Sequence, residues 1–153
     1  MNSIILRITP GTVIWSEEYR LILPLLYHNK RMRIKIPNGI APLVISDLNN
    51  YLITGTFSLE KGVLTILAET MEMSQKDQGI VNIHFDGSIC AIGKVSSQRA
   101  YCIFETGNHE YFPCFVSHCF DLNNSHDLLG AKIQETSKIT LYQGNIAVFQ
   151  VTL

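Results

Sequence analysis

The sequence has few charged residues, and neither sign of charge dominates. Charged residues make up 16% of the 153 residues, and 12 basic side chains nearly balance 13 acidic ones. Proteins that bind nucleic acids usually carry a basic excess or a clustered basic stripe. The basic cluster from Lys30 to Lys35 alternates with apolar residues, as one solvated face of a strand would. We therefore expect no nucleic-acid partner.

Long apolar runs are also missing. The longest, Leu21 to Tyr27, is interrupted by Pro24 and is far shorter than the ~20 residues needed to cross a membrane. Residues 1–7 lack the basic start and the continuous apolar core of a secretory signal peptide. We expect a soluble cytoplasmic protein with no membrane partner. In that compartment buried free thiols are expected at all four cysteines: Cys90, Cys102, Cys114 and Cys119.

Signature motifs for cofactors and catalysis are absent. The sequence contains no glycine-rich phosphate loop, no dinucleotide fingerprint and no Gly-x-Ser-x-Gly elbow. No stretch resembles the motif set of a known family. We expect no cofactor.

Short alternating segments bounded by turn residues are abundant. We count about ten to twelve of them at spacings of about 8 to 12 residues, and no convincing helix longer than about two turns. This pattern is typical of an all-β, mainly antiparallel fold, either a β-sandwich or a closed barrel, with at most one or two short helices. A chain of 153 residues can bury a core of its own, so we predict a single β domain over 1–153.

The clearest hairpin signal lies in the segment 80–93. Asp86-Gly87 suits a two-residue type I′ turn, because both central residues of that turn need positive φ, which glycine tolerates best. The turn would set Phe85 opposite Ser88 and fix the register of the strands on either side. We predict that the rest of the fold is organised around this hairpin.

A second hairpin is predicted over 51–68. A turn at Lys61-Gly62 would set Leu59 opposite Leu64. Gly55 lies in mid-strand, which indicates a bulge or a close approach of two backbones.

Weaker signals place hairpins at both ends of the chain. Residues 3–15 read as two strands around a Pro-Gly turn, and a turn at 143–145 would pair Ile139 with Phe149. Pro113 favours an edge or bulged strand, because it has no N–H to donate to a neighbour. Further strands are expected at 19–23, 31–36, 43–46, 101–105, 111–120 and 132–135.

A candidate internal repeat divides the chain near its middle. The tetrapeptide at 47–50, Asp-Leu-Asn-Asn, recurs at 121–124. Two similar halves, 1–78 and 79–153, would bury one face against each other. The alternative is coincidence, because strands rich in the same residues resemble one another.

The densest group of reactive side chains lies at 109–119. His109, Cys114, His118 and Cys119 are zinc-ligand types, but they lack the Cys-x2-Cys spacing that holds a metal from one side. The loop 121–127 offers oxygen ligands but lacks the glycine and final glutamate of a calcium loop. We expect no metal site. The candidate for catalysis is a Cys–His pair made by Cys114 or Cys119 with His118 or His109.

Aromatic side chains outside obvious core positions are the other lead. Tyrosine and tryptophan dominate binding hot spots, although most aromatic residues of β proteins fill cores. The candidates for binding are Trp15, Tyr19, Tyr27, Tyr111, Phe112 and Phe115.

Three functions compete on these observations. The first is a non-enzymatic domain that binds another protein, for example a small cytosolic inhibitor or a toxin-neutralising protein. The second is a small-molecule-binding barrel or a Cys/His-dependent hydrolase that uses residues around 109–119. The third is a structural subunit of a homo-oligomeric assembly whose edge strands pair between copies.

Overall fold

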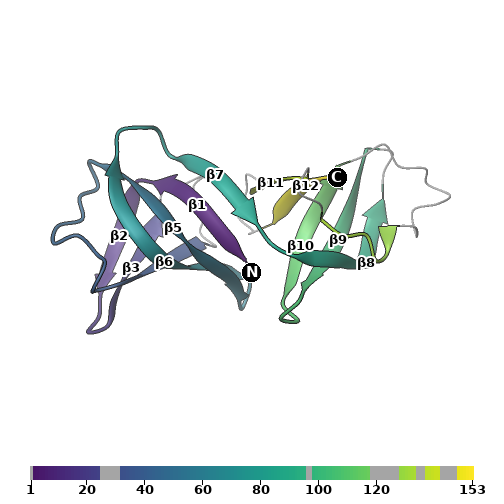
Figure 1. Cartoon of the computed structure of the whole chain (residues 1–153), viewed down its shortest axis with the longest axis horizontal. Coiled ribbons are helices and arrows are strands. Elements are labelled where there is room, and N and C mark those ends of the chain that lie inside the picture. Colours follow the sequence, from purple (N-terminus) through teal and green to yellow (C-terminus); the bar gives the residue numbers. More distant parts are fainter. Residues whose placement is uncertain (1, 25–31, 96–97, 118–127, 134–136, 142–147) are drawn as a thin grey trace. The chain divides into compact units, whose positions relative to one another are not determined.

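The computed structural model describes residues 2–24, 32–95, 98–117, 128–133, 137–141 and 148–153 (Figure 1). The described residues form twelve strands and no α-helix. These strands make two mostly antiparallel sheets of seven and five strands, which confirms the all-β prediction. No helix in the described part of the chain is long and apolar enough to span a membrane.

The chain divides into two compact units. Among the described residues, the first unit runs to Ile83, and the second comprises those at 84–141 and 148–153. The single domain over 1–153 and the repeat halves 1–78 and 79–153 stay predictions.

The first unit is built on the seven-stranded sheet. Its strands are β1 (Ser3–Ile8), β2 (Pro10–Trp15), β3 (Tyr19–Pro24), β4 (Met32–Pro37), β5 (Asn50–Glu60), β6 (Val63–Ser74) and β7 (Gly79–His84). Their order is β2-β3-β4-β6-β5-β1-β7, and β4 pairs with β6 in parallel. Because β2 and β7 are the ends of this order, the described strands do not close into a barrel. The described strands thus form two open sheets.

Alternation of side chains builds the core of this sheet. Along β4, the buried Met32, Ile34 and Ile36 alternate with the more exposed Arg33 and Lys35. The sequence predicted this strand from the same period of two. The inward positions of the neighbouring strands complete the core with Ile4, Leu6, Ile8, Ile22, Tyr51, Ile53, Phe57, Leu64 and Ile66.

The hairpin of β5 and β6 forms as predicted. Leu59 pairs with Leu64, and the register shifts at Gly55, where the bulge was expected. Both turn residues adopt positive φ, with 51° at Lys61 and 78° at Gly62. These angles are those of a type I′ turn, whose twist matches that of the two strands.

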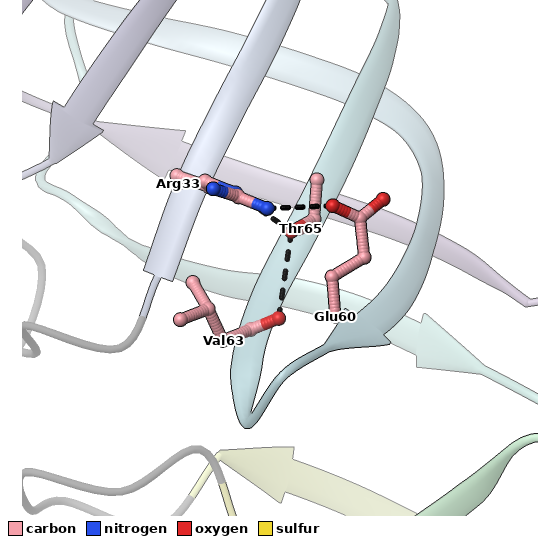
Figure 2. A network of polar contacts seen from close by, with 4 residues as sticks. All are labelled: Arg33, Glu60, Val63 and Thr65. Carbon is pink, nitrogen blue, oxygen red and sulfur yellow. Dashed lines mark hydrogen bonds and ion pairs between the residues drawn. The ribbon is translucent and has the colours of Figure 1, made fainter.

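A polar network ties β4 to the end of that hairpin (Figure 2). The Arg33 Nε donates a hydrogen bond to the Thr65 hydroxyl at 3.0 Å, and its Nη2 donates to a Glu60 carboxylate oxygen at 2.6 Å. The Thr65 hydroxyl in turn donates to the carbonyl of Val63 at 3.4 Å. Arg33 thus joins the parallel strand pair to the hairpin turn.

The second unit is built on the five-stranded sheet. Its strands are β8 (Gly87–Val95), β9 (Arg99–Thr106), β10 (Tyr111–Ser117), β11 (Lys138–Leu141) and β12 (Phe149–Thr152), in the order β11-β12-β10-β9-β8. Phe85 is fully buried, and its ring lies 5.4 to 5.8 Å from the rings of Phe104, Phe112 and Phe149. These four rings form the centre of the second core.

The predicted hairpin over 80–93 does not form. β7 pairs with β1 in the seven-stranded sheet, whereas β8 pairs with β9 in the other sheet, where Ser88 faces Glu105. Gly87 does not adopt positive φ, so Asp86-Gly87 makes no type I′ turn. Burial of Phe85 among three other rings explains the change of sheet, since an aromatic side chain gains more there than on a hairpin face.

The two terminal hairpins also differ from the prediction. β1 pairs with β5, and β2 pairs with β3, so residues 3–15 form two strands but no hairpin. Ile139 pairs with Val151 instead of Phe149. A shift of two residues keeps every side chain on its predicted face, which is why alternation could not reveal it.

Pro113 lies in an inner strand, against the prediction of an edge or bulged strand. β10 runs between β9 and β12, but its pairing with β12 begins only at Cys114. On the other side Pro113 pairs with Ile103. The proline thus lies where β12 does not yet require a backbone donor.

Candidate functional site

The loop 38–49 carries the three large apolar side chains with the highest exposed fractions among the described residues. The exposed fraction is 92% for Leu43, 75% for Val44 and 90% for Leu48. The predicted strand at 43–46 is wrong, because the loop pairs with no other strand. In the sheet β6 lies between β4 and β5, so the chain uses this loop to pass the end of β6 (the blue loop leading into β5 in Figure 1).

Hydrogen bonds anchor this loop at both ends. The Pro37 carbonyl accepts bonds from the N–H groups of Ile40 and Ala41, both at 3.1 Å. Near the other end, the backbone N–H of Ser46 donates to the hydroxyl of the buried Tyr51 at 2.9 Å. The loop that carries the exposed leucines is therefore held near both of its ends.

The same loop is joined to the turn between β2 and β3. The side-chain amide of Asn38 donates to the carbonyls of Ser16 and Glu17, at 3.3 and 2.8 Å. The backbone N–H of Asn38 donates to the Glu18 carbonyl at 3.1 Å. We call the loop 38–49 together with residues 15–19 the loop–turn surface.

Two predicted binding residues lie on the loop–turn surface, each beside a cation. Trp15 is 63% exposed, and the guanidinium carbon of Arg20 lies 3.9 Å from its ring centroid. The Lys35 ammonium lies 5.6 Å from the ring centroid of Tyr19. Arg20 itself is buried, and its Nε has no hydrogen-bond partner among the described residues. The cation–π contact therefore holds the indole over a cation that has little access to water.

The other predicted binding residues belong to the second unit. Tyr111 is 54% exposed, whereas Phe112 is fully buried in the aromatic core. Phe115 is half-buried, with its ring 5.5 Å from that of Tyr101 and 4.5 Å from the guanidinium carbon of Arg99. Tyr27 lies outside the described residues.

Cys114, one of the two cysteines proposed as the nucleophile, is in the core. The side chain of Cys114 is fully buried, and its thiol donates to the Cys102 carbonyl at 3.5 Å. Burial, together with the nearby thiols of Cys102 and Cys90, raises the pKa of Cys114. Burial also raises the pKa of Cys102 to about 11. Both groups stay protonated near neutral pH, which is the unreactive form of a thiol.

The candidate base His109 lies in solvent. Its side chain is 83% exposed, and Nδ1 lies 2.8 Å from a carboxylate oxygen of Glu105. His118 and Cys119 lie outside the described residues. Within the described ranges no group of three or more His, Cys, Asp or Glu side chains is placed to hold a metal ion.

A polar depression lies in the second unit. Its volume is about 310 Å³, at the lower limit of small-molecule sites. The lining combines carboxylates, hydroxyls and one ammonium group from Asp86, Gly87, Ser88, Glu105, Thr106, Gly107 and Lys132.

Comparison of the chain with protein-family models, with curated proteins and with solved structures found no match. The candidate site therefore rests on geometry. The sequence indicated Trp15 and Tyr19 but missed Leu43, Val44 and Leu48. The available signal was an apolar run over 40–45 that contains Pro42 and does not alternate.

Proposed function

We propose that this chain is a non-enzymatic domain that binds another protein through the loop–turn surface. The observation that carries the proposal is the exposure of Leu43, Val44 and Leu48 on an anchored loop. Clustered exposed apolar residues commonly mark interaction sites. Burying one such side chain contributes about 1.5 to 3 kcal/mol.

The cation-backed rings of Trp15 and Tyr19 support the same proposal. Tryptophan, tyrosine and arginine are the residue types that most often dominate binding energy. A ring held by a cation loses less conformational freedom on binding, and such preorganisation raises affinity.

More specific forms of this function rest on the sequence. A cytoplasmic inhibitor that covers the active site of a toxin or enzyme is one of them. The small-molecule alternative has the polar depression in its favour, whereas the protonated Cys114 lends no support to the hydrolase. A structural subunit of an assembly stays a prediction.

The double variant Leu43→Ser/Leu48→Ser tests the proposal. The wild-type chain would be used to isolate a partner from native lysate, and the dissociation constant of the purified complex would then be measured. Leu43 and Leu48 would be buried in the complex. Their loss should therefore weaken binding at least about 30-fold, or about 2 kcal/mol.

The matched control is Leu129→Ser. Leu129 is 52% exposed, belongs to the second unit and lies outside the loop–turn surface. The control should bind like the wild type, and all variants should keep the wild-type circular-dichroism spectrum. Equal affinity of the double variant and the wild type would contradict the proposal.

A further inference from the structure

Strand β2 offers an open edge next to the loop–turn surface. It is the first strand in the order of its sheet, and β3 is its neighbour among the described strands. The register runs from Thr12–Leu23 to Trp15–Arg20, with a bulge between Pro10 and Thr12. The segment 12–15 is therefore regular strand, and no described strand pairs with its outer side.

This edge lacks the usual protection against pairing. Natural edge strands are commonly blocked by charged side chains, prolines or bulges. Here Pro10 and the bulge protect the start, but residues 12–15 are Thr-Val-Ile-Trp and carry no charge. Ile14 is 48% exposed and Trp15 63% exposed. Because consecutive side chains of a strand point to opposite faces, an added strand would meet apolar surface on both.

Two carboxylates without an ion-pair partner among the described residues follow the edge directly. Glu17 and Glu18 are exposed, and neither forms an ion pair with a described residue. The nearby cations Arg20 and Lys35 are placed over the rings of Trp15 and Tyr19. The two carboxylates are exposed, whereas Arg20 is buried beneath the Trp15 ring and Lys35 is half-buried. The charged groups that an added strand meets first at this end are therefore carboxylates, which can pair with a basic group.

We infer that β2 receives an extended segment of the partner protein as an eighth strand, with a lysine or arginine of that segment facing Glu17 and Glu18. Backbone hydrogen bonds to residues 12–15 would supply affinity, and the alternating side chains would supply specificity. The inference rests on the proposed function and names the form in which the partner binds.

Charge favours such a segment over a second copy of this chain. A copy that paired β2 with β2 would add an uncharged strand followed by the same two glutamates. An anionic lipid surface would be repelled by these carboxylates.

Capped hexapeptides of alternating valine and threonine provide the probe. One peptide has a lysine at each end, a second has a glutamate at each end, and a third is the lysine peptide with alternate backbone nitrogens methylated. Trp15 is the single tryptophan of the chain, so its emission reports binding at this edge. Hydrogen exchange of the full chain then shows whether the amides of residues 12–15 become protected.

The lysine peptide should shift the Trp15 emission and slow exchange at 12–15. It should bind about tenfold more tightly than the glutamate peptide, and the methylated peptide should not bind. Glu17→Lys/Glu18→Lys should reverse the preference between the charged peptides. Ile14→Lys should weaken all binding, whereas the control Leu129→Lys in the second unit should change nothing.

Several results would overturn the inference. They are equal affinities for the two charged peptides, unchanged exchange at 12–15, protection that grows with protein concentration in the absence of peptide, and a Trp15 shift produced only by lipid vesicles. If no peptide binds while Leu43→Ser/Leu48→Ser still abolishes partner binding, this inference fails and the proposed function stands.

Discussion

Gly55 is the residue at which backbone packing leaves least room for a side chain. A Cβ added there would overlap the carbonyl oxygen of Leu67 on β6. We expect Gly55→Ala to lower the free energy of unfolding by about 2 kcal/mol or more, because the bulge has to open. The measurement is urea unfolding followed by circular dichroism.

Gly79→Ala is the control for that substitution. A Cβ at Gly79 would meet no atom within 4 Å, and its φ lies outside the left-handed region. We expect the same or a higher free energy of unfolding, by up to about 1 kcal/mol. Equal losses in the two variants would contradict the account of the bulge.

Thiol ionisation should make stability depend on pH. Burial raises the pKa of Cys102 from 9.0 to about 11, so the unfolded chain releases this proton at lower pH than the folded chain does. The stabilising contribution is complete below about pH 9 and is lost as pH rises toward about 11.

We expect Cys102→Ala to flatten the fall in unfolding free energy between about pH 9 and 11. The control Cys90→Ala removes an exposed thiol and should keep the wild-type slope. Urea titrations across this pH range measure all three slopes, and identical slopes would contradict burial as the cause of the raised pKa.

The conformation or burial of a single residue could be predicted from the sequence where its neighbours in the chain determine it. Lys61 and Gly62 were assigned to a turn because both the turn chemistry and the flanking alternation pointed to it. Cys102 and Cys114 were expected in the core because they lie in apolar stretches, and both are buried. The same expectation is wrong for Cys90, which is exposed, and Cys119 lies outside the described residues. The cation–π contact of Arg20 with Trp15 could not be predicted, because it depends on the pairing of β2 with β3.

At the scale of elements, the hydrogen-bond network of Arg33 should contribute little to the free energy of unfolding. The side chains of Arg33 and Glu60 are 32% and 45% exposed, so water screens the pair. A double-mutant cycle with Arg33→Gln and Glu60→Gln should give a coupling of about 0.5 kcal/mol. A coupling above about 2 kcal/mol, measured by urea unfolding, would show that the pair is far less solvated than its exposure indicates.

Most strands were predictable, whereas their partners were not. Alternation defined β4 and β5 because one face of each is buried. The same alternation in β7 and β8 suggested a hairpin, but strand pairing there depends on residues far away in the chain. The local sequence pattern does not show that β7 pairs with β1 and that β8 pairs with β9.

For the whole molecule, the main feature that the sequence did not predict is the exposed loop 38–49. The run over 40–45 has the composition of a buried strand, and only the crossing from β4 to β5 places it in solvent. The aromatic candidates Trp15 and Tyr19 were indicated by residue type alone. Their role in binding stays a prediction, as does that of Tyr111 and Phe115.

Hydrogen exchange of the full chain, with and without its isolated partner, tests the central claim most directly. The account predicts slower exchange in residues 38–49 and 12–19 when the partner is bound, and unchanged exchange at 105–107 around the polar depression. Slower exchange confined to 105–107 and Lys132, with the loop and β2 unaffected, would contradict it.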